Sequence, residues 1–281
     1  MVPLLLAVAW DTLKILGIVL ALMVLVEYAE IRFGAGLQRL LRGRGLPQYG
    51  LAAALGAVPG CVDAFLVVSL YKAGLVSFGT LAAVMLATAG DEAFVMLAVI
   101  PQTAFLIFAL CFLVGVAGGY GADWLARRLR LPLHPPCGAE IHPARQPRVD
   151  LRHFMREHIY GHILRRHLGP LVIWLFLTLL LLALADRYLD LRPLLPSNDV
   201  LLVIVAAIVG LVPGSGPHLV FLLLFADGLI PLSALVANSV SQDGHGVLPL
   251  LACAPRDAVL VKVYAAAVGL VVGLALLVLG L

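Results

Sequence analysis

Charged residues are scarce in this 281-residue sequence: Asp, Glu, Lys and Arg make up 12% of it, about half of their usual share in soluble domains. Hydrophobic residues make up 62%. This composition excludes a soluble protein and predicts an all-α integral membrane protein, because a helix needs about 20 apolar residues to cross a bilayer. The basic residues behind the net charge of +3 are concentrated in two short tracts, which indicates membrane topology rather than a nucleic-acid partner.

Motifs of several other protein classes are also missing. The four cysteines (Cys61, Cys111, Cys137 and Cys253) form no CxxC pair, so neither a disulfide framework nor a zinc knuckle is expected. No Walker A string for nucleotide binding is present. Residues 1–10 carry no basic segment ahead of the apolar run, so we expect a first span rather than a cleavable signal peptide.

The chain contains long apolar runs that Gly and Pro interrupt. Runs bounded by charged residues, Pro or Gly predict helical segments near residues 4–28, 50–72, 75–100, 102–120, 170–186, 200–225, 229–252 and 257–280. Four of them are broken at mid-depth, at Pro59-Gly60, Gly90, Pro213-Gly214 and Gly244. Because broken helices are tolerated in a membrane only where protein or a wet cavity surrounds them, we expect the breaks to meet inside the bundle.

The sequence repeats itself at an offset of 154 residues. Without a gap, this offset pairs Pro59-Gly60 with Pro213-Gly214 and Gly90 with Gly244. Such matches are informative because Gly and Pro mark backbone positions with special dihedral requirements. The predicted organisation is a first membrane repeat in residues 1–120, an Arg- and His-rich linker in 121–168 and a second membrane repeat in 169–281.

Arginine positions predict the orientation of the repeats. Arginines are concentrated between Arg32 and Arg44 and again in the linker, which places both segments in the cytoplasm and the N-terminus outside. The first repeat then crosses the membrane an odd number of times, so the second is inverted relative to it. Two inverted-topology repeats with broken or re-entrant helices meeting at mid-membrane are typical of secondary transporters.

Polar and ionisable residues cluster at the repeat-equivalent breaks. Because a charge at mid-bilayer is costly, such residues usually face a cavity and mark a pathway. Oxygen ligands suit a hard divalent cation, and an imidazole shifts the preference toward manganese, iron or zinc. Helical spacing places Asn238, Ser241, Gln242 and His245 on one face. The predicted metal-binding set is Asp91, Glu92, Asn238, Gln242, Asp243 and His245. In the alternative interpretation, the acids cap half-helices and tie down a turn.

Other polar residues are candidates for lining the pathway. Asp63 and His218 follow the Pro-Gly breaks, where an N-cap and a helix-start histidine are the other interpretation. Glu27 lies near the cytoplasmic end of the first span, where it could equally anchor the interface. Asp11 and Lys14, one helical turn apart, are expected to neutralise each other. The predicted pathway residues are Asp63, His218, Thr88, Ser241 and Glu27.

Three runs of the sequence resemble a known family. They are Ala-Thr-Ala-Gly90-Asp91-Glu92-Ala-Phe-Val-Met-Leu, Val212-Pro-Gly-Ser-Gly-Pro-His218 and Leu235-Val-Ala-Asn238-Ser-Val-Ser-Gln242-Asp243-Gly244. They are similar to the ten-span heavy-metal exporters, many of whose members are called manganese transporters. The resemblance implies a polytopic inner-membrane protein that exports a metal ion. The chain departs from the family pattern at His245, where another acid is expected, and this affects the metal preference.

Together, the pattern and the resemblance predict a secondary transporter, not an enzyme. It would export a divalent heavy-metal cation, manganese first, across the inner membrane in exchange for protons, with no cofactor. An exporter of an oxyanion or organic acid is an alternative, because helix N-termini can bind anions. Polyprenyl-pyrophosphate phosphatases also have inverted repeats with Pro-Gly-Ser breaks, but here no Arg follows either break to hold a phosphate.

The predicted mechanism depends on the charge of the combined site, which would hold three acids and one imidazole. Like charges in a low-dielectric cavity favour protonation, so the empty site is expected to carry protons that a bound dication expels. Asp91→Asn and Asp243→Asn are each expected to abolish export with folding intact. His245→Ala is expected to change the order of metal preference more than the rate.

Overall fold

The structure, a computed structural model, describes residues 2–41, 46–60, 62–88, 90–131, 133, 168–188, 198–244 and 246–281. The side chains of Glu27 and Asp63 and the whole of His245 lie outside this description, as does most of the predicted linker. The described residues form helices and no strand beyond one isolated bridge. Their bounds are α1 (Val2–Leu41), α2 (Leu46–Gly56), α3 (Val62–Lys72), α4 (Phe78–Ala87), α5 (Glu92–Val99), α6 (Pro101–Arg128), α8 (Gly169–Tyr188), α9 (Asp199–Val209), α10 (Gly216–Ala226), α11 (Leu232–Ser241), α12 (Leu248–Cys253) and α13 (Pro255–Val278).

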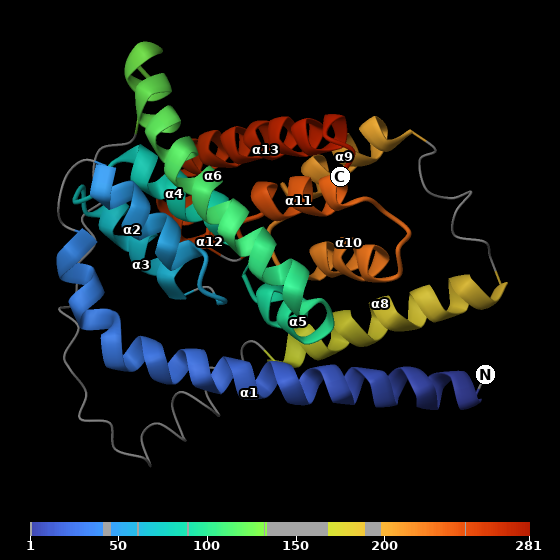
Figure 1. The fold of residues 1–281 in the computed structure, drawn as a ribbon. Helices are drawn as coiled ribbons and strands as arrows, with labels where there is room; N and C mark the ends of the chain where they lie inside the picture. Colours follow the sequence, from blue (N-terminus) through green and yellow to red (C-terminus); the bar gives the residue numbers. More distant parts are fainter. Residues whose placement is uncertain are drawn as a thin grey trace.

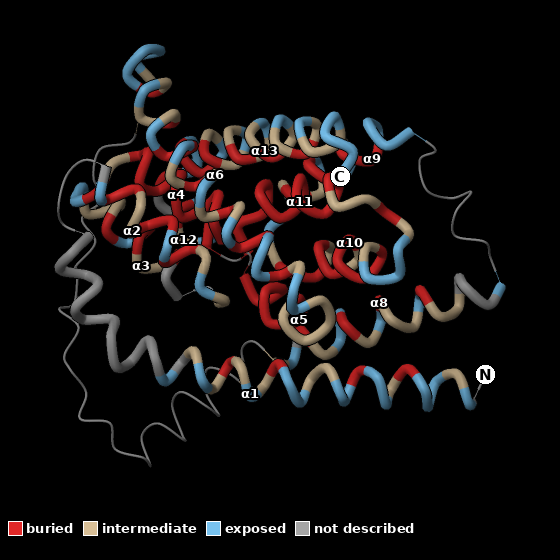
Figure 2. The backbone as a smooth tube through the Cα atoms, viewed as in Figure 1, coloured by how far each residue is buried: buried red, intermediate tan, exposed pale blue. Residues whose placement is uncertain are grey.

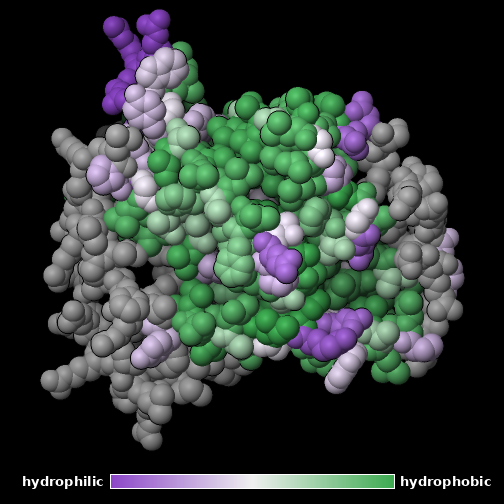
Figure 3. Space-filling view, in the orientation of Figure 1, coloured by the Kyte–Doolittle hydropathy of each residue, from purple (hydrophilic) through white to green (hydrophobic). Residues whose placement is uncertain are grey.

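Long apolar helices confirm the prediction of an all-α, multi-span membrane protein. Pro3–Val26, Pro101–Arg128 and Pro255–Val278 are each long and apolar enough to cross a membrane. Large apolar side chains such as Phe105, Leu106 and Val271 are about two-thirds exposed on these spans. The visible face of the molecule is accordingly hydrophobic over most of its area (Figure 3), as expected of a surface in contact with lipid.

The helices of the two halves correspond at the offset that the sequence repeat predicts. Helices α3 and α10, α4 and α11, and α6 and α13 each begin 154 residues apart. Helices α2 and α9 end 153 residues apart, one residue less than the offset. The first copy therefore runs from α2 to α6 and the second from α9 to α13, preceded by α1 and α8 respectively. Helix α6 continues to Arg128, beyond the boundary predicted at residue 120.

Each copy brings its own two breaks together. Gly60, Gly90, Gly214 and Gly244 all have positive φ, at 129°, 56°, 105° and 54° respectively, which explains the need for glycine. The Gly60 amide donates to the Gly90 carbonyl over 3.3 Å, and the Gly214 amide donates to the Gly244 carbonyl over 2.9 Å. The prediction that the breaks meet is confirmed within each copy, and the two contacts are equivalent at the repeat offset.

Several helices next to the breaks are too short to cross a bilayer. Helices α2, α3, α9 and α10 have 11 residues each, which gives a length of about 16 Å at 1.5 Å per residue. This is about half of a hydrocarbon core of roughly 30 Å. Helices α2 and α3 therefore form a half-membrane hairpin, as do α9 and α10. The pairs α4–α5 and α11–α12 are the interrupted spans.

Small residues hold the interrupted spans against the long ones. A Cβ on Gly115 would lie 2.8 Å from the Ala83 carbonyl oxygen, and one on Gly269 would lie 2.7 Å from the Ala237 carbonyl oxygen. Such close approach between backbones is typical of membrane helices with Gly at a four-residue spacing, as at Gly115 and Gly119 or Gly269 and Gly273. Helices α4 and α11 are thereby buried along nearly their whole length at the centre of the bundle (Figure 2).

Contacts between the copies are reciprocal. Helix α3 contacts α12 and the equivalent α10 contacts α5; likewise α4 contacts α13 and α11 contacts α6. Reciprocity of this kind is what a two-fold relation between the copies produces. Equivalent helices also run in opposite directions in Figure 1. Helix α1 runs toward the left and its counterpart α8 toward the right; likewise, α6 runs toward the left and its counterpart α13 toward the right. This arrangement agrees with inverted repeats, whose orientation in a membrane stays a prediction.

Candidate functional site

The candidate site forms where the two interrupted spans break. Helix α4 ends at a C-cap, Thr88, and helix α11 ends at the equivalent C-cap, Gln242; both have extended backbones, with ψ of 133° and 160°. The Gln242 amide still donates to the Asn238 carbonyl over 3.0 Å, so helical spacing reaches Gln242 and ends there, before the shared face predicted for residues 238–245 is complete. The extended backbone at Gln242 redirects the chain that follows it.

A direct hydrogen bond joins the two breaks. Nε2 of Gln242 donates to Oε2 of Glu92 over 2.8 Å. Both side chains are fully buried. Glu92 is in the first turn of α5, while Asp91 before it takes the N-cap position and makes no capping hydrogen bond with its side chain. Two predicted site residues from different copies are therefore in contact, and neither acid caps the half-helix in the way that the alternative interpretation requires.

Asp243 has a partner that the sequence analysis overlooked. Nζ of Lys262, on α13, lies 2.9 Å from Oδ2 of Asp243, and their side chains are only 11% and 3% exposed. Lys262 comes seven residues after Pro255, about 10 Å into the span. A lysine at that depth in an apolar helix was the signal available in the sequence, because such a residue normally needs a partner. The cluster is therefore less acidic than predicted.

Three buried side-chain oxygens at this cluster have no hydrogen-bond partner: Oε1 of Glu92, Oε1 of Gln242 and Oδ1 of Asp243. Buried polar atoms are nearly always paired, so each unpartnered one needs an explanation. Carboxylate oxygens accept and do not donate, so a cation or a donor would satisfy them. Glu92 bonds to Gln242, and Asp243 is the next residue after Gln242 in the chain. We call these three residues the acceptor cluster.

Asn238 and His218 form a separate hydrogen-bonded pair. Oδ1 of Asn238 lies 3.2 Å from Nδ1 of His218, and Nδ2 of Asn238 donates to the Ala206 carbonyl over 2.9 Å. The other ring nitrogen of His218, Nε2, lies 3.1 Å from the Val212 carbonyl oxygen. Both side chains are fully buried. The pair ties α9, α10 and α11 together at the second Pro-Gly break, so its observed contacts are structural.

Ser241 and Thr88 are also placed by the structure. Oγ of Ser241 donates to the Ala237 carbonyl over 2.6 Å and lies against Gly269, at the packing face between α11 and α13. Ser241 therefore takes part in helix packing, and its place in the pathway stays a prediction. Thr88 is buried at the break of the first copy, at the position equivalent to Gln242.

Within the described part of the chain, no three His, Cys, Asp or Glu side chains come together in a group that could hold a metal ion. The acceptor cluster contains the carboxylates of Glu92 and Asp243 and the amide of Gln242. The predicted fourth member, His245, lies outside the described residues, as do the side chains of Asp63 and Glu27.

A cavity of about 410 Å³ lies away from these breaks, between α1, α8 and the end of α10. It is lined by Val8, Asp11, Leu179, Leu182, Ala183, Leu223, Asp227 and Leu229. None of these was a predicted site residue. Asp11 forms the predicted pair with Lys14, with Nζ 2.6 Å from Oδ1, and both side chains are more than half exposed.

Comparison with known proteins assigns a family to this arrangement. The family model described as "Putative, 10TM heavy-metal exporter" matches residues 5–163 and 169–279. The chain belongs to this family. No curated protein and no solved structure matches the chain.

Membership in the heavy-metal exporter family supports a multi-span membrane protein concerned with metal export, and a transporter rather than an enzyme. The number in the family description also fits the structure. With each interrupted span counted once, the apolar helical segments among the described residues are α1, α2, α3, α4–α5, α6, α8, α9, α10, α11–α12 and α13. Four of these ten are half-length helices, so fewer than ten segments can cross the bilayer completely.

Proposed function

We propose that this protein is a secondary transporter that exports a divalent heavy-metal cation, manganese first, from the cytoplasm across the inner membrane in exchange for protons. The observation that carries the proposal is the acceptor cluster: three buried oxygens without partners, on Glu92, Gln242 and Asp243, at the contact between the two copies. A bound cation would give partners to acceptor oxygens of this kind.

The chemistry of the cluster favours a divalent cation. Carboxylate and amide oxygens are hard ligands, which suit manganese and similar ions better than soft thiolates do. Cys111, the only buried cysteine among the described residues, packs within an apolar cluster. Carbonyl groups freed at the breaks of α4–α5 and α11–α12 can complete the coordination, as they do in transporters built on broken helices.

Proton coupling follows from the ligands. Carboxylates bind a metal ion in their deprotonated form, so binding a dication at Glu92 would release any proton that this carboxyl group carries. Reprotonation from the other side would then help to release the metal ion. No Walker A string is present to couple export to a nucleotide, so an ion gradient is the proposed source of energy.

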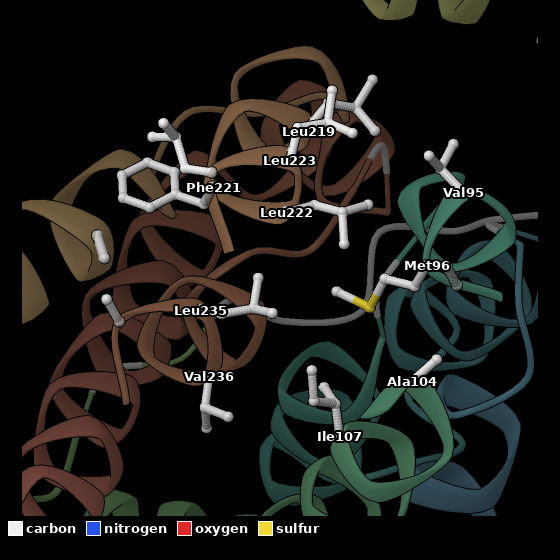
Figure 4. Packing of buried hydrophobic residues seen from close by; sticks show 14 of the residues in the cluster. Val95, Met96, Ala104, Ile107, Leu219, Phe221, Leu222, Leu223, Leu235 and Val236 are labelled. Atoms are coloured by element: carbon white, nitrogen blue, oxygen red, sulfur yellow. The ribbon is translucent and has the colours of Figure 1, made fainter. Parts of the chain in front are cut away.

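Two apolar clusters flank the breaks and would serve as the barriers. Along α4–α5 the chain passes from one cluster, with Leu81, to the other, with Met96. Along α11–α12 it passes in the opposite order, from Leu235 to Leu250. Figure 4 shows one of these clusters, where α5 and α6 of the first copy face α10 and α11 of the second. Alternating access would require the two clusters to open one at a time.

An oxyanion is the second candidate substrate, and a specific observation favours it. Lys262 holds a positive charge beside Asp243 inside the bundle. An ammonium group can bind an anion, and helix N-termini at the breaks would assist it. Two carboxylates in the same group disfavour an anion, so the cation remains the primary proposal.

The test is transport by purified protein in proteoliposomes. Flux of manganese and zinc is measured at two pH values, with an opposing proton gradient and without one. The proposal expects cation flux that the proton gradient accelerates. Absence of cation flux together with flux of an oxyanion such as arsenate or phosphate would overturn it in favour of the second candidate.

A further inference from the structure

Lys262 and Asp243 form an ion pair inside the bundle. Their charged atoms are 2.9 Å apart, and neither side chain is more than 11% exposed. Only Oδ2 of Asp243 contacts the ammonium group, while Oδ1 has no partner. The carboxylate is thus neutralised by a cation and can still accept another.

The repeat shows that both charges belong to the second copy alone. At the offset of 154, Asp243 corresponds to Ala89 and Lys262 corresponds to Phe108. Two apolar positions of the first copy are therefore an acid and a base in the second, and the structure brings that acid and base together. Packing between α11 and α13 does not require them, because the equivalent helices α4 and α6 pack closely without such a pair.

We propose that the Lys262 ammonium group is a tethered substitute for the transported cation. It neutralises Asp243 when the site is empty, and the metal ion displaces it on binding. This inference rests on the proposed function and adds a mechanism for returning the empty site. A carrier must expose its empty site to both sides in turn, and an unpaired carboxylate would oppose that movement because a buried charge without a partner is costly. Lys262 removes this barrier.

The inference makes a prediction that a purely structural pair does not. A substitute cation competes with the substrate, so its removal should tighten metal binding while it slows the return of the empty carrier. In Lys262→Met, the KM for manganese is expected to fall about tenfold, and the maximal flux is expected to fall by at least as much. Lys262→Arg keeps the charge and is expected to stay closer to the wild type in both constants.

Tyr264→Phe is the matched control. Tyr264 lies on the same helix and donates a hydrogen bond to the Gly118 carbonyl of the first copy over 2.7 Å. Its removal disturbs a contact between the copies away from the acceptor cluster, so KM should not change. An unchanged KM in Lys262→Met, or an increase in KM like that of a general structural defect, would overturn the inference.

A measurement on the wild type covers the case in which Lys262→Met fails to fold. A small amine-reactive reagent is applied with and without manganese, and labelling of each lysine is followed by mass spectrometry. Displacement by the metal ion should make Lys262 label several times faster. Lys14, whose pair with Asp11 lies outside the acceptor cluster, should label at the same rate in both conditions. Equal labelling of Lys262 with and without manganese would overturn the inference.

Failure of the inference can be told apart from failure of the proposed function. If the wild type transports manganese but neither KM nor labelling responds as expected, only the role of Lys262 is wrong. If the wild type transports no divalent cation, and Lys262→Met abolishes flux of an oxyanion, both proposals are wrong and Lys262 binds the anion.

Discussion

The amide Nε2 of Gln242 donates a hydrogen bond of 2.8 Å to Oε2 of Glu92, although the two residues are 150 positions apart. The bond links the break of α11–α12 to that of α4–α5, and both partners are fully buried. Each copy alone supplies only part of this polar group, so the site exists because the two copies meet there.

Gln242→Leu should destabilise the protein and weaken metal binding. The change leaves Oε2 of Glu92 without its donor, which costs about 1–3 kcal/mol for a buried acceptor. Thermal unfolding in detergent, with and without manganese, measures both effects. Tyr264→Phe, which also removes one hydrogen bond between the copies, should retain the stabilisation by manganese. Equal loss of that stabilisation in both variants would contradict a specific role of Gln242.

Asp243→Asn should impair folding as well as export. The sequence alone suggested that folding would stay intact, but the substitution leaves the Lys262 ammonium buried without its partner. Breaking a buried pair in this way costs about 3–5 kcal/mol. The double variant Asp243→Asn with Lys262→Met removes both charges and should regain most of the stability, while export stays lost. Comparison of the unfolding midpoints of the two variants tests this, and equal midpoints would contradict it.

Gly119→Ala should lower stability because there is no room for a methyl group. A Cβ there would lie 2.7 Å from the Gly79 carbonyl oxygen and 2.8 Å from the Cβ of Ala83, and overpacking of this kind costs about 1–3 kcal/mol. Gly50→Ala is the control, since a Cβ at Gly50 meets nothing within 4 Å. The melting temperature should fall in the first variant and stay the same or rise slightly in the second; equal falls would contradict the packing between α4 and α6.

The inverted orientation can be tested at two equivalent turns. Ala73 and Asp227, 154 residues apart, directly follow α3 and α10, at the start of the turns that lead to α4 and α11. In a background without native cysteines, Ala73→Cys should react with an impermeant thiol reagent only from the cytoplasmic side. Asp227→Cys should react only from the outside. Reaction of both from the same side would contradict inverted repeats.

The repeat predicted most of the fold, because backbone requirements are local. A glycine with positive φ constrains its own residue, so Gly60, Gly90, Gly214 and Gly244 could be recognised as breaks from the sequence. The contact between Glu92 and Gln242 was predicted only as membership in one cluster, since the bonded atoms depend on how the copies pack.

Partner choice could not be predicted in the same way. Asn238 belongs to the predicted metal-binding set, and its amide contacts His218 and the Ala206 carbonyl, which come from two other helices. Its role as a ligand stays a prediction. Lys262 was overlooked because an apolar helix of 24 residues looks like a complete span with or without it. Its depth in the span, and comparison with Phe108 at the repeat offset, were the two signals that could have drawn attention to it.

Manganese flux through wild type and Glu92→Gln in the same proteoliposome preparation tests the central claim most directly. Glutamine keeps the size of the side chain and can still bond to Gln242, but it removes the negative charge from the acceptor cluster. The account predicts wild-type flux that an opposing proton gradient accelerates, and flux at least tenfold lower and insensitive to the gradient in Glu92→Gln. Undiminished flux through Glu92→Gln, with the same response to pH as the wild type, would contradict it.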